Sequence, residues 1–443
     1  MASYLYRNSP VPTSEKKFTF STWLKMSDAS TSADNGIVEW YKSSSERYQI
    51  LIDSATRQLR LYAVEAGVVK ATIYSNMVFR DTNAWYHIVI HSDTTQSSSS
   101  DAFKLWVNGS AQTFSSYTWS YNQNVNVNVF DGSGTKLNLG TRGEAYATWL
   151  NGYLADTYYI DGSLIAYTEF GETDSTTGEW KPNTQPTISS FGNAGVHLKY
   201  ENSGTIGLDS SGNTNNFTAS GTVTQTEDNP SNVFATWNSL KKLTITLSNG
   251  NTTTSGNGDN GVWSTIGNNS GKWYWETQQN ANGTMMGIVN EDVTQTTSRS
   301  ENVGVYGVQN GNGSYAYYRN NGSNGQSSGF PELTTSNVVC HALDLDNGKY
   351  FMGVDGVFKN LSGTTSNLGT GADPTFTGLD TTKFWFPFTE CRGNGAGCDA
   401  NFGNGFFGTT AISSEGTNAS GIGKFEYDVP TGYTALSTKG LNE

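Results

Sequence analysis

The chain is short of charge. Its 443 residues include 26 lysines and arginines and 39 aspartates and glutamates, so 15% of the residues are charged and the formal net charge is −13. A typical globular protein is about 25% charged. Proteins bind a phosphate backbone through Lys and Arg that displace counterions, and an acidic chain with no basic run is repelled by it. We therefore expect no nucleic-acid partner.

Long apolar runs are also missing. No stretch approaches the ~20 consecutive apolar residues that a membrane-spanning helix needs. The first residues, MASYLYRNSPVPTSEKKFTF, lack the apolar segment of a signal peptide. The sequence thus predicts a soluble protein that does not insert into a membrane and is not exported by the general secretory route.

Cysteine and histidine are scarce, with three and four residues. An odd number of cysteines in so long a chain does not form a disulfide framework, and a CxxC metal site is absent. Cys391 and Cys398 flank the loop RGNGAG and could be bridged locally. In a reducing cytoplasm both thiols stay free, and this is the state that we expect.

Turn-forming and aromatic residues are abundant instead. Glycine numbers 50 and aromatic residues reach 13%, a pairing that favours strands joined by short turns. Phe18, Phe20, Thr22 and Leu24 alternate along one face of a predicted half-buried strand. The same alternation recurs in segments 48–52, 59–64, 85–92 and 103–109. Many short strands separated by polar turns predict an antiparallel two-sheet sandwich.

The first of these segments resemble a known family. STWLK, WYHIVIHSD, FKLWVNG and the later LNGYLADTYYIDG at 150–162 look like the strands of laminin-G-like, concanavalin-A-like jelly rolls. The resemblance spans about residues 1–180. Residues 181–235 have the composition of a connector, yet they include Phe191, Leu198 and Phe217. Such apolar side chains predict an ordered strap rather than a flexible tether.

A second sandwich is predicted over residues 236–443. LDLDNGKYFMGVDG at 343–356 reads as strands joined by turns at Asp346-Asn347-Gly348 and Asp355-Gly356, residues that tolerate a positive φ. Together with GKWYWET it resembles the SPRY family over about residues 236–400. The predicted fold class is therefore all-β, with two tandem antiparallel β-sandwiches, a concanavalin-A-like jelly roll followed by a SPRY-like sandwich.

The whole layout is similar to structural proteins of tailed bacteriophages of aquatic bacteria. The intervening LDSSGNTNNFTASG and DNPSNVFATWNSL and the closing GKFEYDVPTGYTALSTKGLN belong to the resemblance. It implies a virion protein, assembled in the bacterial cytoplasm, whose partners are other virion proteins and a host-surface glycan or receptor. Phage appendages generally use closed symmetry, so a homo-oligomer is expected, a trimer if the protein is a fibre.

Catalysis is not expected. A retaining glycosidase needs two carboxylates ~5–5.5 Å apart, which an ExDxxE strand would supply, and no such pattern occurs. Asp344 and Asp346 alternate, but Asp346 opens the predicted DNG hairpin, and the favoured interpretation of the pair is turn and surface carboxylates. His87 and His91 would share a strand face; zinc is conceivable there, but a solvated sheet face is the favoured interpretation.

Ligand sites can be proposed only from composition. Calcium prefers oxygen ligands, and the loops that begin at Asp131, Asp174 and Asp209 are rich in oxygen, although ordinary turns look the same. No other cofactor is implied. The aromatic clusters at 115–124 and 314–325 could contact a glycan or could be buried. They contribute the candidate ligand-binding residues Trp119, Tyr121, Tyr317 and Arg319.

The N-terminal residues Tyr4, Leu5 and Tyr6 are candidates for docking to the virion, or for the first edge strand of the jelly roll. Three functions remain open at this stage. The favoured one is a non-enzymatic tail fibre or surface appendage that mediates host adhesion. The alternatives are an architectural capsid-decoration or joining protein that binds only virion proteins, and a polysaccharide-degrading enzyme.

Overall fold

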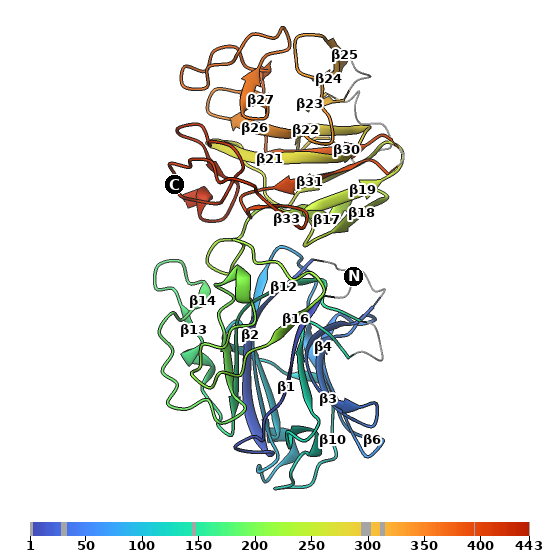
Figure 1. Cartoon of the computed structure of the whole chain (residues 1–443), viewed down its shortest axis with the longest axis vertical. Coiled ribbons are helices and arrows are strands. Elements are labelled where there is room, and N and C mark those ends of the chain that lie inside the picture. Colours follow the sequence, from blue (N-terminus) through green and yellow to red (C-terminus); the bar gives the residue numbers. More distant parts are fainter. Residues whose placement is uncertain are drawn as a thin grey trace. The chain divides into compact units, whose positions relative to one another are not determined.

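The computed structural model describes residues 3–27, 33–143, 148–293, 303–310, 315–393 and 395–442. The chain divides into two compact units, Met1–Gln225 and Thr226–Glu443. Both are built of sheets whose strands pair antiparallel with one short parallel exception in the second unit (Figure 1). The helices in the described ranges are short 3₁₀ turns, and no helix there is long and apolar enough to cross a membrane.

The larger sheet of the first unit has eight strands. Their order across the sheet is β10 (Phe114–Trp119), β6 (Val68–Val78), β5 (Gln58–Glu65), β4 (Glu46–Ile52), β3 (Asn35–Ser43), β11 (Lys136–Leu139), β1 (Tyr4–Asn8) and β16 (Thr218–Ser220). Neighbouring strands pair antiparallel throughout. The N-terminal strand β1 is thus an interior strand of this sheet, because β16, from far along the chain, pairs with its other edge.

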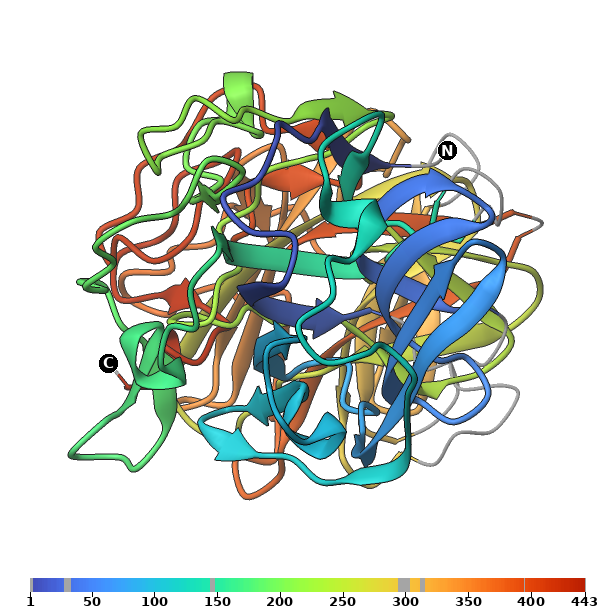
Figure 2. The ribbon, with the colours of Figure 1, turned by 90° about the horizontal axis from the view of Figure 1, so that it is seen from below.

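The second sheet of this unit has six strands. In order they are β15 (Val196–Leu198), β12 (Gly152–Asp161), β2 (Lys17–Met26), β7 (Trp85–Asp93), β8 (Phe103–Val107) and β9 (Ser110–Ala111). Figure 2 shows β12 in green beside β2 in dark blue, with the curved blue strands of the eight-stranded sheet to one side. A separate hairpin is formed by β13 (Gly171–Thr173) and β14 (Trp180–Pro182).

Aromatic rings hold the two sheets of the first unit together. Trp40 of β3 is fully buried, and its ring centroid lies 4.8 Å from that of Phe18 on β2 and 5.3 Å from that of Tyr159 on β12. Tyr48 and Phe130 complete the cluster in edge-on or tilted contacts. Such pairs contribute about 0.5–1.5 kcal/mol each beyond the burial of their area. The predicted two-sheet sandwich is confirmed.

Strand β2 is buried on both faces, whereas the alternation predicted a half-buried strand. The second face is closed because Trp23 stacks on His87 at 4.7 Å and Trp180 of β14 lies over the same imidazole at 6.0 Å. The predicted solvated position of His87 is therefore wrong, and burial lowers its pKa to about 3. His91 is half-buried, with Nε2 2.8 Å from the carbonyl oxygen of Ile165.

Residues 181–225 belong to the first unit. Leu198 and Phe217 are buried in its core, and Tyr200 packs against that core. Phe191 packs against a smaller cluster on the outer face of the six-stranded sheet. This part of the expected connector is therefore held in place by the apolar side chains that predicted its order.

The second unit also contains two large sheets. The seven-stranded sheet consists, in order, of β17 (Trp237–Lys242), β20 (Asn260–Ser264), β30 (Trp385–Cys391), β22 (Thr284–Asn290), β23 (Val305–Gln309), β24 (Ala316–Asn320) and β25 (Ser323–Ser327). The other sheet follows the order β18 (Ile245–Ser248), β19 (Thr253–Gly256), β31 (Gly397–Asn401), β21 (Lys272–Ala281), β26 (Val338–Asp344), β27 (Lys349–Val354) and β28 (Val357–Lys359). Two short strands extend this sheet. Strand β29 (Phe376–Thr377) pairs with β27, and strand β34 (Thr434–Ala435) pairs with β21.

Both turns predicted in the segment 343–356 are confirmed. Gly348 precedes β27 with a φ of +61°. Asp355 and Gly356, which connect β27 to β28, have φ values of +50° and +80°. Positive φ at both central residues is the requirement of a type I′ hairpin turn, which explains why aspartate and glycine occupy these positions.

Glu276 of β21 ties the C-terminal segment to the second unit. Its carboxylate accepts hydrogen bonds from the backbone N–H groups of Glu426 and Tyr427 at 2.9 and 2.8 Å. The Tyr274 hydroxyl at 2.9 Å and the Asn401 amide at 3.2 Å also donate to it. Burial is the main cause that raises the pKa of Glu276 to about 7. Four donors on one buried carboxylate indicate a structural role.

The three cysteines, Cys340, Cys391 and Cys398, are buried and free. The free state expected for Cys391 and Cys398 is confirmed. Burial raises the pKa of each thiol to about 12. Because the thiolate is the reactive form, these side chains serve packing rather than chemistry at neutral pH.

Candidate binding site

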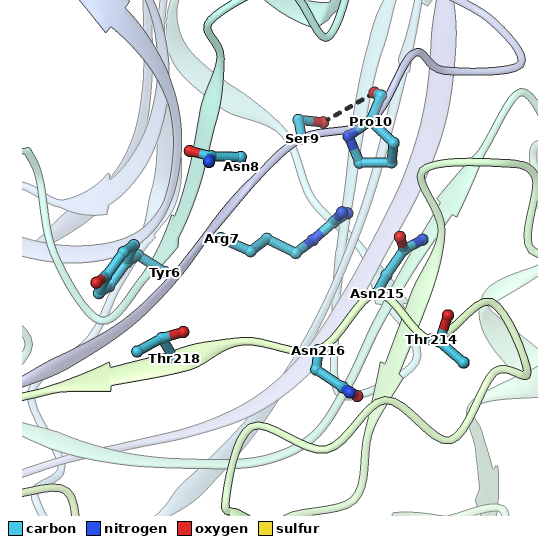
Figure 3. A pocket seen from close by; sticks show the side chains of 9 residues that line it. All are labelled: Tyr6, Arg7, Asn8, Ser9, Pro10, Thr214, Asn215, Asn216 and Thr218. Atoms are coloured by element: carbon cyan, nitrogen blue, oxygen red, sulfur yellow. Dashed lines mark hydrogen bonds between the residues drawn. The ribbon is translucent and has the colours of Figure 1, made fainter.

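A pocket of about 400 Å³ opens along β1 in the first unit (Figure 3). One wall is β1 with the residues that follow it, and the other is the loop that leads into β16. The lining consists of Tyr6, Arg7, Asn8, Ser9, Pro10, Thr214, Asn215, Asn216 and Thr218. Except for the proline, every one of these side chains carries a hydroxyl, amide or guanidinium group. The pocket is therefore a polar one, of a size that suits a small ligand.

Arg7 is the charged group of the pocket. Strand alternation places Leu5 and Arg7 on the inner face of β1, so the side chain of Arg7 is only 5% exposed. Figure 3 shows it extending from β1 toward Asn215. Its Nη2 donates to the carbonyl oxygen of Ala194 at 2.5 Å, and the guanidinium carbon lies 5.3 Å from the centroid of Phe217. Within the described part of the chain, Nε and Nη1 have no hydrogen-bond acceptor.

Two carboxylates lie close enough to act on this guanidinium. Burial is the largest effect and lowers the pKa of Arg7 to about 10, while Asp209 and Asp161 oppose it. Asp161 accepts hydrogen bonds from the backbone N–H groups of Thr13, Ser14 and Ala194. Asp209 is similarly occupied by donors of its own loop. Among the described residues neither carboxylate forms a hydrogen bond or ion pair with Arg7, whose guanidinium still carries its charge at neutral pH.

Side-chain hydrogen bonds build the loop that forms the second wall. The carboxylate of Asp209 accepts from the backbone N–H of Ser211 and of Asn215, both at 2.8 Å, and from the N–H of His197 at 3.0 Å. Asn216 accepts from the N–H of Asp209 at 2.8 Å. Asp and Asn favour such turns because their short side chains reach nearby backbone. The Asn- and Ser-rich composition thus gives an ordered wall.

The pocket offers both donors and acceptors. Amides such as those of Asn8, Asn215 and Asn216 supply an N–H and a carbonyl oxygen each, and a serine or threonine hydroxyl can do either. Tyr6 contributes a half-buried ring at the rim, with Lys136 Nζ 6.0 Å from its centroid. Polar groups that match hydroxyls, beside a ring that can stack, suit a saccharide better than an apolar ligand.

The docking residues expected at the N-terminus are divided by strand alternation. Leu5 is buried in the core at 4% exposure, so it is a packing residue. Tyr4 and Tyr6 face outward with their centroids 5.9 Å apart. Tyr6 lines the pocket, and Tyr4 does not. The alternative that these residues form a strand of the jelly roll is confirmed, but its edge position is wrong, because β1 lies between β11 and β16. A docking role stays a prediction for Tyr4.

The aromatic candidates do not form one site. Trp119 packs against the core of the first unit, and Tyr121, 5.2 Å from it between centroids, is buried in that core. Tyr317 and Arg319 lie on β24 of the second unit. The Tyr317 hydroxyl is 3.1 Å from that of Tyr315, and Arg319 Nη1 donates to the carbonyl of Tyr318 at 3.1 Å. Ser314, which begins that cluster, lies outside the described residues.

The carboxylates suggested for calcium have other partners. Asp131 forms an ion pair with Lys42 at 2.6 Å, and Asp174 pairs with Lys181 at 2.9 Å. Asp209 is surrounded by N–H and O–H donors, whose positive ends would repel a cation. Among the described residues no group of three or more His, Cys, Asp or Glu could hold a metal ion.

The acidic pair in the predicted turn also has structural partners. Asp344 accepts from the backbone N–H of Asn347 at 3.1 Å and pairs with Lys272 at 3.1 Å. Asp346 accepts from the N–H of Gly271 at 2.7 Å. Asp346 is thus a turn carboxylate, as expected. Asp344, however, is the last residue of β26 and is only 1% exposed, so it is not the surface carboxylate that was expected.

Comparison with known proteins supports the fold of the first unit. Residues 2–166 match the family described as the concanavalin A-like lectin/glucanases superfamily. The predicted concanavalin-A-like fold is thereby confirmed for this part of the chain, and a lectin-like sandwich indicates a binding role.

Solved structures similar to the chain include two SPRY domains. That of human HERC1 is 14% identical with a TM-score of 0.29, and the alignment covers 37% of this chain and 96% of that one. The PSpry domain of TRIM65 is 13% identical with a TM-score of 0.29, and the alignment covers 38% of this chain and 91% of that one. No curated protein matches the chain.

Arg7 was not among the residues singled out from the sequence. The signal was the pentapeptide YLYRN, in which Arg7 shares a strand face with Leu5. A charged residue at a core-facing position is costly to bury unless it is paired, so it marks a site to inspect.

Proposed function

We propose that this protein is a non-enzymatic component of a tailed-phage virion, a tail fibre or surface appendage, that attaches the particle to saccharides on the host surface. The observation that carries the proposal is the polar pocket beside β1, whose lining of amide and hydroxyl side chains lies beside the half-buried ring of Tyr6. The hydroxyl groups of a saccharide would find both donors and acceptors there. The lectin-like fold of the first unit supports the same reading.

The virion assignment rests on the layout of the chain, a laminin-G-like sandwich followed by a SPRY-like one, and on free, buried cysteines that suit a reducing cytoplasm. In this proposal other virion proteins are partners, and the chain is a homo-oligomer, a trimer in a fibre. Several weak contacts then act together. Linking binding sites raises the overall affinity 10²–10⁴-fold when geometry permits simultaneous engagement, so a weak pocket suffices.

The proposal is tested by the adhesion of the purified, labelled chain to a panel of aquatic bacteria. We expect binding to at least one strain, competed by the soluble surface polysaccharide of that strain and weakened by Tyr6→Ala. Tyr4→Ala is the matched control, because Tyr4 is the neighbouring outward ring on the same strand and does not line the pocket. Adhesion that free polysaccharide does not compete, or that Tyr6→Ala leaves intact, would contradict the proposal.

The architectural alternative is favoured by one feature of the second unit. Leu240 lies on β17 at the edge of the seven-stranded sheet and is 69% exposed. An edge strand presents backbone groups that can pair with another chain. If this edge joins the protein to the virion, Leu240→Glu lowers incorporation into particles and leaves cell binding unchanged. Normal incorporation of this variant would remove the alternative.

A further inference from the structure

We infer that the pocket beside β1 binds N-acetylated sugars by taking their acetamido group into a gap in the hydrogen-bond ladder between β1 and the chain that leads into β16. The inference rests on the proposed saccharide binding and names the class of sugar. It depends on the juxtaposition of the backbone of Asn8 with that of Asn216 across the pocket, which both residues line.

The pairing of β1 with β11 decides where the backbone groups of β1 point. In an antiparallel pair, residues whose N–H and C=O bond to the partner strand alternate with residues whose groups point away from it. The N–H of Ser9 donates to the carbonyl oxygen of Thr135 at 2.8 Å, so the groups of Ser9, and of Arg7 two residues before it, face β11. The N–H and C=O of Asn8 therefore point the other way, toward the side on which β16 and the pocket lie.

Strand β16 stops short of Asn8. Its register with β1 ends at the pair Tyr6–Thr218, so the next bonded pair of the ladder would be Asn8 with Asn216. In the described ranges no hydrogen bond joins the backbones of these two residues, and their N–H and C=O groups have no other partner there. Both residues are exposed, and Figure 3 shows them on the two segments that wall the pocket. The pocket thus lies where the ladder lacks one pair.

An amide group suits such a gap. It is planar and trans, so its N–H and its C=O point in opposite directions, as they do in a strand that lies between two neighbours. An acetamido C=O can accept from the N–H of Asn8 while the acetamido N–H donates to the C=O of Asn216. A sugar hydroxyl offers its donor and its acceptor on one oxygen atom, so it does not reproduce this geometry. The half-buried ring of Tyr6 leaves apolar surface for the sugar ring beside it.

A peptide also carries amides, but the gap does not continue as the edge of a sheet. A strand that adds to an edge needs an N–H and a C=O at every second residue of that edge. On one side of Asn8 the next such residue is Tyr6, which is already paired with Thr218. On the other side it is Pro10, which has no N–H. The gap therefore offers a single amide position, which fits an acetamido substituent better than a peptide strand.

Isothermal calorimetry on the full chain tests the inference with pairs of probes that differ in the acetamido group. Chitotriose and cellotriose share their linkage and ring configuration, and methyl N-acetylgalactosaminide with methyl galactoside makes a second pair. We expect at least one N-acetylated probe to bind about tenfold more tightly than its hydroxyl counterpart or better, a difference of about 1.4 kcal/mol. The peptide N-acetyl-trialanine amide should bind about tenfold more weakly than that probe or worse.

Two variants at one position isolate the backbone N–H. Asn8→Pro removes the N–H on the pocket side and leaves the bonds between β1 and β11 in place, whereas Asn8→Ala keeps the N–H and removes only the side-chain amide. The N-acetylated probe should bind about tenfold more weakly to Asn8→Pro than to Asn8→Ala. Circular dichroism and thermal unfolding check that both variants keep the fold. The paired probes test the inference on the unmodified chain if Asn8→Pro does not fold.

The outcomes separate the two proposals. If the members of each pair bind equally well and Tyr6→Ala weakens both, the saccharide pocket stands and the preference for the acetamido group is wrong. Equal binding by folded Asn8→Pro and Asn8→Ala, or tighter binding of the peptide, would also overturn the inference. If no N-acetylated probe binds, the inference is wrong, and the proposed function then depends on the competition of cell adhesion by host polysaccharide. If that competition fails as well, both proposals fall.

Discussion

Replacement of Gly348 by valine tests the hairpin that organises the second unit. Gly348 has a φ of +61°, a conformation that costs a residue with a Cβ roughly 1–2 kcal/mol. A Cβ built there lies 2.9 Å from the carbonyl oxygen of Leu379, which is closer than real Cβ atoms approach, so that segment must shift. We expect Gly348→Val to lower the free energy of unfolding by about 2 kcal/mol or more, which corresponds to ~4–8 °C in Tm for a unit of this size.

The chain offers a matched control in Gly378, which also has a positive φ, +77°, but has no atom within 4 Å of a built Cβ. Gly378→Val therefore carries the cost of the backbone conformation without the contact, and it should be the milder of the two variants. Both are measured by thermal and urea unfolding with saccharide binding as a second readout, which neither change should affect. An unchanged unfolding midpoint for Gly348→Val would show that the turn is misplaced.

Four further predictions follow from the same contacts. The pKa of Glu276, about 7, lies above its ordinary value of 4.5, so the stability that it contributes is complete below pH 4.5 and is lost as the pH rises through 7. The measurement compares the free energy of unfolding of the unmodified chain with that of Glu276→Gln. At 1.36 kcal/mol per pKa unit, the difference in favour of the unmodified chain should be about 2 kcal/mol larger at pH 5 than at pH 7.5. A difference that does not change with pH would refute the assignment. Incubation with host polysaccharide should release no reducing sugar; turnover abolished by changing one acidic residue would establish an enzyme. Light scattering should give a multiple of 47.9 kDa, threefold for a fibre, whereas the monomer mass at micromolar concentration would argue against self-association. Tyr4→Ser should lower virion incorporation if Tyr4 docks to the particle, and full incorporation would remove that role.

The sheets could be predicted from the sequence because their signals are local. Alternation in residues 18–26 identifies the core face of β2, and aspartate with glycine at 355–356 specifies a turn whose φ values only a few residues tolerate. The burial of the second face of β2 could not be predicted in this way. It depends on Trp180, which reaches His87 from 93 positions along the chain through a hydrogen bond of 3.0 Å.

The pocket was missed for the same reason. The contacts of Arg7 with Ala194 and Phe217 depend on the pairing of β16 with β1. Local sequence patterns do not predict a pairing between strands more than 200 residues apart. Composition pointed to the correct loop, since Asp209 was noted for its oxygen-rich surroundings. It suggested calcium, whereas in the structure the donors around that carboxylate build the wall of a polar pocket.

The most direct test is a crystal structure of the full chain with a host-surface saccharide that binds to it. The account predicts that the sugar lies in the pocket between β1 and the loop 214–218, with its hydroxyls within hydrogen-bond distance of the amides of Asn215 or Asn216 and a ring against Tyr6. A saccharide bound on any other surface of the chain, with the pocket beside β1 empty at a saturating concentration, would contradict it.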